Sequence, residues 1–291
     1  MVEPLVWKAH DSYILGLSYS PDGQQLISCG GDGAIALWSP QSAEERLRWQ
    51  AHEQSANGLA LSPDGSLLAS ISSDRTARIW TFPQGDAVAT VQDRKRVTST
   101  LTWSAQGDLL VVGSYGGRVA IWTRDGEPVN GVAVSKGNVA TVSLSPDDQT
   151  LVTGGRGDDV SLWSFPAIEP LRTLSLHRDA VTGSRFLRRG ETLATLGYRG
   201  KLAFWRASDW SLRQEHTLAE SARAVIWSPD ESLAAIMAKG RILLRRTDDW
   251  GLVADWPSLT PVVNTAAFAH DGQHLAVGGA DGRIALYPLG G

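Results

Sequence analysis

Cysteine is almost absent from this sequence, which has only Cys29 among its 291 residues. A single thiol cannot form a disulfide within the chain, so nothing here indicates an oxidising compartment. Long apolar runs are also missing, since no stretch approaches the ~20 apolar residues that cross a membrane. The first residues lack the basic and apolar parts of a signal peptide. We therefore expect a cytoplasmic protein that has no membrane partner.

Basic residues are not in excess, because 27 Lys and Arg stand against 31 Asp and Glu, for a net charge of −4. Domains that bind nucleic acid usually carry a strong basic excess. We therefore expect no nucleic-acid partner.

Motifs for metals and cofactors are missing as well. No spacing among the histidines matches a zinc site, and the sequence has no calcium loop and no phosphate-binding loop. No segment shows a convincing helical period. We therefore expect no cofactor, no metal and an all-β protein.

What the sequence does contain is a repeated pattern, clearest between Leu47 and Phe82. Apolar and polar residues alternate there in four short runs, and this period of two predicts β-strands. Turn residues separate the runs; Pro63 has the fixed φ that a turn needs, and Gly65 tolerates a positive φ. The four runs are Leu47–Gln50, Ala56–Leu61, Leu67–Ile71 and Thr76–Trp80.

Copies of this pattern fill the chain. Two landmarks, a large residue that ends the fourth run and a turn after the second, each occur seven times at intervals of roughly 40–42 residues. The large residues are Trp38, Trp80, Trp122, Trp163, Trp205, Arg245 and Tyr287. The turns begin at Ser20, Ser62, Ser104, Ser145, Leu187, Ser228 and Ala269. Such a period predicts one domain over residues 1–291, a seven-bladed β-propeller of four-stranded antiparallel blades.

The two ends of the chain predict a split last blade. Leu5–Lys8 resembles Leu47–Gln50, with Trp7 matching Trp49, so the chain begins with an isolated strand. The last repeat, residues 262–287, has only three strands. We expect these segments to pair, because pairing removes an open sheet edge.

The motifs Ala-His, Ser-Pro-Asp-Gly, Ser-Ser-Asp and Ile-Trp, in this order, resemble the WD-repeat β-propeller family over residues 5–287. The sequence departs from the family's pattern where Trp-Asp is replaced by Trp-Ser, Trp-Thr or Trp-Arg. Repeat six departs most, with Arg245 in place of Trp and a short hairpin at Ala238-Lys239-Gly240. We expect it to be the least stable blade.

His, Ser, Asp and Trp of the repeat could be mistaken for parts of a hydrolase site. The resemblance implies instead a structural network, in which His lies between Asp and Ser, and Ser accepts from the Trp N–H. We expect this role, and no catalytic residue, because a nucleophile must face an open pocket. The network residues are His10, Ser28, Asp32 and Trp38 in repeat one, and His52, Ser70 (or Ser72), Asp74 and Trp80 in repeat two.

The resemblance also implies that a protein or peptide binds the face formed by the loops before first strands and the hairpins between second and third strands. Matching positions are Tyr13, Leu15, Asn57, Tyr115, Tyr198 and Asn264. Basic residues of the same loops predict a cationic arc for an acidic or phosphorylated segment. They are Arg94, Lys95, Arg96, Lys136, Arg156, Arg178, Arg199 and Lys239. The alternative is a solvated surface that nearby Asp residues partly neutralise.

We therefore expect a monomeric, non-enzymatic scaffold or adaptor. Two alternatives stay open. One is a recognition or regulatory subunit of a larger complex whose effector is another chain. The other is a propeller enzyme, a hydrolase or lyase, with its site in the central channel.

Overall fold

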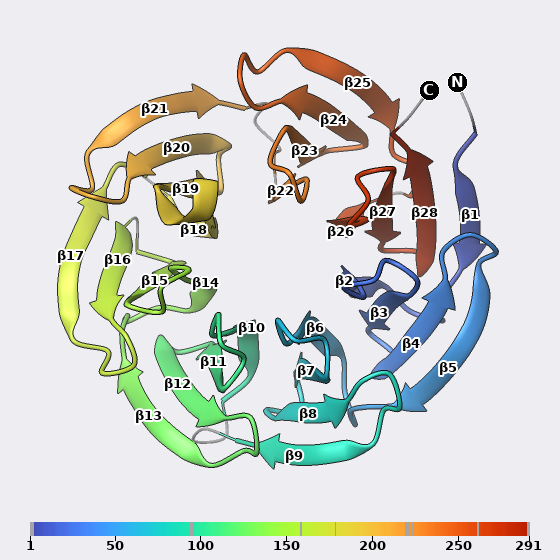
Figure 1. Ribbon diagram of the computed structural model, residues 1–291, viewed down its shortest axis with the longest axis horizontal. Coiled ribbons are helices and arrows are strands. Elements are labelled where there is room, and N and C mark those ends of the chain that lie inside the picture. Colours follow the sequence, from blue (N-terminus) through green and yellow to red (C-terminus); the bar gives the residue numbers. More distant parts are fainter. Residues whose placement is uncertain are drawn as a thin grey trace. The chain divides into compact units, whose positions relative to one another are not determined.

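The computed structural model describes residues 3–92, 96–157, 159–177, 179–218, 222, 224–260 and 262–289. These residues form strands and turns, with one 3-10 turn, η1 (Arg188–Gly190), and no α-helix among them. The strands form seven four-stranded antiparallel sheets (Figure 1). The predicted fold class, an all-β propeller of seven blades, is confirmed.

Blade 1 contains β2 (Ile14–Tyr19), β3 (Leu26–Gly30), β4 (Ala34–Ser39) and β5 (Glu44–Gln50). Blade 2 contains β6 (Ala56–Leu61), β7 (Leu67–Ser72), β8 (Ala77–Thr81) and β9 (Ala87–Val91). Blade 3 contains β10 (Thr98–Trp103), β11 (Leu109–Ser114), β12 (Arg118–Thr123) and β13 (Pro128–Ala133). Blade 4 contains β14 (Val139–Leu144), β15 (Thr150–Gly155), β16 (Asp159–Ser164) and β17 (Pro170–Ser175).

Blade 5 contains β18 (Val181–Leu187), β19 (Thr192–Gly197), β20 (Lys201–Arg206) and β21 (Leu212–Thr217). Blade 6 contains β22 (Ala224–Trp227), β23 (Leu233–Ala238), β24 (Arg241–Arg246) and β25 (Leu252–Pro257). Blade 7 contains β26 (Val263–Phe268), β27 (His274–Gly279), β28 (Arg283–Pro288) and β1 (Leu5–Lys8).

Contacts group the chain into two compact units. Unit 1 is Met1–Leu61, Ser72–Asp74 and Ala224–Gly291, and contains blades 1, 6 and 7. Unit 2 is Ser62–Ile71 and Arg75–Arg223, and contains blades 3, 4 and 5. Within each unit, side chains of neighbouring blades pack together into apolar clusters. One such cluster in unit 2 joins Val152 and Leu162 of blade 4 to Val181 and Leu193 of blade 5.

The last blade is split, as the two ends of the sequence predict. In unit 1, β1 runs antiparallel beside β28, with Leu5 opposite Leu286 and Trp7 opposite Ile284 (Figure 1). The ring of Trp7 packs against that of Trp38 in blade 1, with 5.9 Å between their centroids. The first strand of the chain therefore completes the sheet that the last three strands begin.

In most blades, the turn between the first and second strands is closed by hydrogen bonds from side chains within the turn. In blade 1 the Ser20 hydroxyl donates to Asp22, and Gln25 N–H donates back to Ser20 Oγ at 2.9 Å. The hydrogen bond from Ser20 is the main reason that the pKa of Asp22 lies below its usual value. The same Ser–Asp pair occurs in the turns of blades 2, 4 and 6, at Asp64, Asp147 and Asp230.

Candidate partner-binding surfaces

Blade 1 contains a complete network of four side chains, of which three are buried and the fourth, Asp32, is partly buried. Trp38 Nε1–H donates to Ser28 Oγ at 2.8 Å, and Ser28 Oγ lies 2.7 Å from His10 Nε2. His10 Nδ1 lies 2.9 Å from Asp32 Oδ2. One direction satisfies every group: the Ser28 hydroxyl donates to Nε2, and Nδ1–H donates to the carboxylate.

Electrostatics agrees with an ionised Asp32. Its partial burial raises the pKa, but the hydrogen bond and charge attraction of His10, with backbone N–H groups, outweigh burial and leave the pKa below its usual value. His10 and Ser28 are buried. A Ser–His–Asp order is therefore present, but the Ser28 oxygen also accepts from Trp38 and has no open space in which to attack a substrate.

Other blades keep parts of this network. In blade 2, His52 Nδ1 lies 3.0 Å from Asp74 in unit 1, while in unit 2 Trp80 Nε1–H donates to Ser70 Oγ at 2.9 Å. Ser72 has a different role, because its Oγ accepts from the backbone N–H of Asp74.

In blades 4 and 5 a threonine hydroxyl accepts the Trp N–H in place of serine, which the sequence patterns did not predict. Trp163 Nε1–H donates to Thr153, and Trp205 Nε1–H donates to Thr195, both at 2.9 Å. In blade 5 His177 Nε2 also lies 2.9 Å from Thr195 Oγ1. The motif Ser-Ser-Asp could not reveal this substitution, although Thr has the same hydroxyl.

In the blades where this bond is described, the hairpin between the second and third strands has one equivalent residue, which directly follows the second strand. Its backbone N–H bonds to the residue before the first strand, as in Gly31 N to Tyr13 O at 2.8 Å. Tyr115 N and Tyr198 N make the same bond, to Val97 O and Ala180 O, and Arg156 N donates to Asn138 Oδ1. In blades 1, 2 and 7 the position holds small residues, Gly31, Ser73 and Ala280.

In unit 2 this position carries three large side chains in consecutive blades, which we call the hairpin row: Tyr115, Arg156 and Tyr198. Tyr115 is 54% exposed and Tyr198 is 67% exposed, the largest values among the exposed tyrosines. The first strands of blades 3, 4 and 5 lie side by side, as Ser99 Oγ–H bonding to Val139 O illustrates. The three side chains of the row therefore belong to one end of adjacent blades.

Charged residues beside the hairpin row are mixed in sign. Lys136, Arg96 and Arg199 are exposed, and the backbone N–H of Arg199 donates to Asp179 Oδ2 at 2.6 Å. A cavity of about 180 Å³ adjoins Arg156 and is lined by polar groups that include Asn138. Three residues of the predicted arc, Arg94, Lys95 and Arg178, lie outside the described residues.

The remaining predicted contact residues lie in unit 1 and are partly used within the fold. Tyr13 Oη is 2.9 Å from Ser55 Oγ, and Asn57 Oδ1 accepts from Ser73 Oγ at 3.2 Å. Asn264 Nδ2–H donates to Ile14 O at 3.1 Å, which links the first strands of blades 7 and 1. Leu15 and Asn264 both lie at β-bulges, where the register skips one residue.

Among the described ranges, no group of three or more His, Cys, Asp or Glu side chains is placed to hold a metal ion. In the same part of the chain no helix is long and apolar enough to cross a membrane.

Comparison with known proteins finds five segments that match the family described as WD domain, G-beta repeat. They are residues 3–39, 44–81, 87–123, 127–164 and 258–287, more than half of the chain. The strands of blades 5 and 6 lie outside these matches, yet both blades form four-stranded sheets.

Two curated proteins are similar to parts of this chain. A p21-activated protein kinase-interacting protein 1-like protein of Danio rerio is 24% identical over 139 residues, 48% of this chain and 37% of that protein. A ribosome biogenesis protein WDR12 homolog of Chlamydomonas reinhardtii is 29% identical over 122 residues, 38% of this chain and 27% of that protein. The chain therefore spans well under half the length of each.

Proposed function

We propose, since this chain belongs to the WD-repeat β-propeller family, that it is a non-enzymatic scaffold or adaptor that binds a protein or peptide partner. The names of the two relatives describe an interacting protein and a ribosome biogenesis protein, and both suit a role in protein assembly. Turns held by paired strands are ordered before a partner arrives, so little conformational entropy is lost on binding.

The hairpin row is the observation that carries this proposal. Tyrosine is suited to recognition because it is rigid and offers both an apolar ring and a hydroxyl. Tyr115 and Tyr198 expose more than half of their surface to water. An isolated exposed tyrosine is ordinary, but matched positions of three consecutive blades hold two tyrosines and an arginine. A bound segment that lies across the row would meet all three.

The partner segment we propose is acidic or phosphorylated. Arg156 and Arg199 are exposed, and no described group pairs with either guanidinium. A guanidinium can hold a carboxylate or phosphate through two parallel hydrogen bonds. The polar cavity beside Arg156 offers further donors. An exposed arginine alone is worth little, so we expect the tyrosines to supply apolar contact and the arginines to select the charge.

An enzymatic function has no comparable support. The Ser and His of the Ser–His–Asp order in blade 1 are buried, and the Ser oxygen also accepts from a tryptophan, as described above. We therefore propose that the protein acts by binding, as a monomer, in the cytoplasm.

Affinity purification followed by mass spectrometry tests this proposal. The wild-type protein is compared with an Arg156→Glu, Arg199→Glu variant, which reverses two charges beside the hairpin row. A matched control, Arg46→Glu with Arg246→Glu, makes the same charge change at exposed sites of unit 1 that do not belong to the row. The partner must be recovered with wild type and control, and its affinity for the row variant must be lower at low salt.

Equal recovery of the partner by all three proteins would show that it does not bind at the hairpin row. A salt series adds a second check, because screening weakens exposed charge pairs. The difference between wild type and the row variant must therefore shrink as salt rises. Size-exclusion chromatography of the purified protein checks the proposed monomer.

A further inference from the structure

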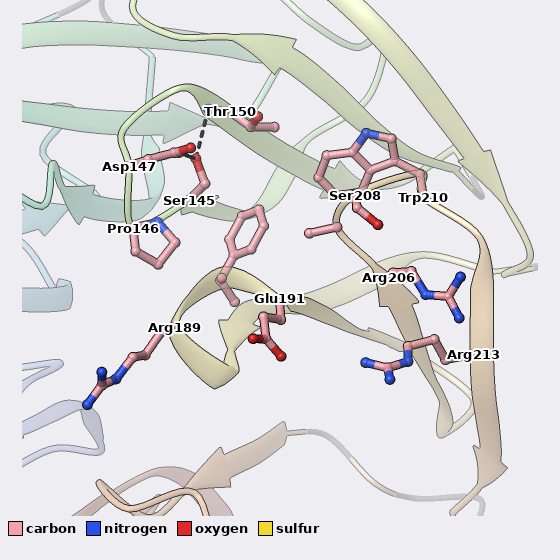
Figure 2. Close-up of a pocket in the computed structure, with 13 residues that line it drawn as sticks. Ser145, Pro146, Asp147, Thr150, Arg189, Glu191, Arg206, Ser208, Trp210 and Arg213 are labelled. Carbon is pink, nitrogen blue, oxygen red and sulfur yellow. Dashed lines mark hydrogen bonds between the residues drawn. The ribbon is translucent and has the colours of Figure 1, made fainter.

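A cavity of about 570 Å³ lies in unit 2 at the opposite ends of the strands from the hairpin row. Three turns form it: the β14–β15 turn of blade 4, and the η1 and β20–β21 turns of blade 5 (Figure 2). Its volume is within the range of ligand-binding pockets, roughly 300–1,000 Å³. We call it the turn pocket.

Apolar side chains form one wall of the turn pocket. Pro146, Phe186 and Trp210 line it, and the rings of Phe186 and Trp210 meet edge to face with centroids 6.4 Å apart. A Cβ on Gly190 would come within 3.0 Å of Pro146, so glycine allows the two turns to approach. The wall is therefore a packed surface to which two blades contribute.

The η1 turn differs from the turns that join the first and second strands of the other blades. In five of the other six, the third residue is Asp, and in blade 5 it is Arg189. Arg188, Arg189 and Gly190 all have positive φ, at 51°, 53° and 98°. Such a conformation is unfavourable for residues with a side chain. This turn has therefore lost the acid that closes its counterparts and presents a cation in its place.

Two further arginines lie on the rim. Arg213 Nη1 donates to Thr192 Oγ1 at 3.2 Å, which orients the guanidinium and leaves its other donors available. Arg206 is 3.3 Å from Asp209. Arg189 has no ion pair or hydrogen bond to any described side chain. Figure 2 shows Arg189 on one side of Glu191 and the other two arginines on the opposite side.

The acids at the pocket leave two arginines available to a ligand. Asp147 accepts from Ser145 and from Gln149 N–H, and the Ser145 bond is the main cause of its lowered pKa. The Asp147 carboxylate therefore accepts its hydrogen bonds from its own turn. Glu191 is exposed and can accept N–H donors of a bound backbone. One of the three arginines is paired with Asp209, so two remain available to a ligand.

We propose that the turn pocket binds an acidic peptide segment of a protein partner. A large apolar side chain of the segment packs on Pro146, Phe186 and Trp210, and its carboxylates pair with Arg189 and Arg213. The site is separate from the hairpin row, so the protein can join two segments at opposite ends of its blades. A single-stranded nucleic acid fits less well, because it carries a negative charge at every nucleotide and the pocket has only two arginines with donors available.

Selection from a phage-displayed library of random dodecapeptides tests the proposal. Wild type is compared with Arg189→Glu, Arg213→Glu, whose two side chains are exposed and whose folding is checked by circular dichroism. The Arg46→Glu, Arg246→Glu protein is the control with the same charge change, and the row variant reports peptides that bind the hairpin row. Selected peptides are synthesised, and their affinities are measured by fluorescence polarisation.

Wild type and control must enrich peptides that combine Asp or Glu with a large apolar residue. The pocket variant must bind these peptides about tenfold more weakly or worse, as expected for a loss of roughly 1.4 kcal/mol. The proposal is wrong if no such peptides are enriched, or if the pocket variant binds them equally. It is also wrong if a random single-stranded RNA binds wild type more tightly and loses affinity in the pocket variant. Loss of binding in the row variant alone would assign the peptides to the hairpin row and contradict the proposal.

Discussion

Replacing Trp7 tests the split blade most closely. Its ring lies on β1, packs against Trp38 and contacts the apolar cluster that joins blades 7 and 1. Its Nε1–H is buried and has no partner among the described residues. We therefore expect Trp7→Ala to destabilise the protein, and Trp7→Phe to change its stability little.

The expected size of the effect follows from burial. Removing a fully buried Trp side chain costs about 3–5 kcal/mol, and Trp7 is only partly buried. Roughly half of that range, about 2 kcal/mol, is expected for Trp7→Ala. At about 2–4 °C per kcal/mol for a chain of this class, the melting temperature should fall by about 4–8 °C. Phe keeps the ring contact and removes an N–H whose burial without a partner is itself unfavourable.

Thermal unfolding followed by circular dichroism measures the difference. Leu5→Ala is a matched control on the same strand, because Leu5 is 40% exposed and its loss should lower the melting temperature by far less. Removing residues 1–9 should have the largest effect, since it exposes the edge of β28. Equal melting temperatures for Trp7→Ala and wild type would refute the role assigned to β1.

Three further predictions concern individual blades. Ser28→Ala should lower the free energy of unfolding by about 2–4 kcal/mol in urea, because Trp38 and His10 each lose a buried partner. Burial lowers the pKa of His177 although Asp179 opposes it; the unfolded chain therefore binds the proton first, and stability should fall as pH drops below ~6.5. That fall should be smaller in His177→Gln, measured by unfolding at pH 7.5 and 5.5. Hydrogen exchange should be fastest in blade 6, whose β22 has four residues, and faster exchange in blade 1 would contradict this.

The repeat predicted the fold because two landmarks recur at nearly the same spacing in every blade. Proline and glycine place the turns, and the alternation of apolar residues fixes which face of each strand is buried. The match between Trp7 and Trp49 was enough to predict the pairing of β1 with β28. The motif specifies serine, so it could not predict that Thr195 supplies the same hydroxyl in blade 5.

The candidate sites were predictable only in part. Tyr115, Arg156 and Tyr198 could be identified because they hold one position of the repeat. The turn pocket could not, since its wall combines Pro146 with Trp210 from turns far apart in the chain. Its one sequence signal was a cation at the position where most other turns have an acid.

Hydrogen–deuterium exchange of the protein, alone and bound to the partner recovered by affinity purification, tests the central claim most directly. If the partner binds the hairpin row, amide exchange should slow in the hairpins that contain Tyr115, Arg156 and Tyr198 and in the loops that precede β10, β14 and β18. Unchanged exchange in all of these segments, with protection confined to other blades or to outer strands, would contradict the proposed function.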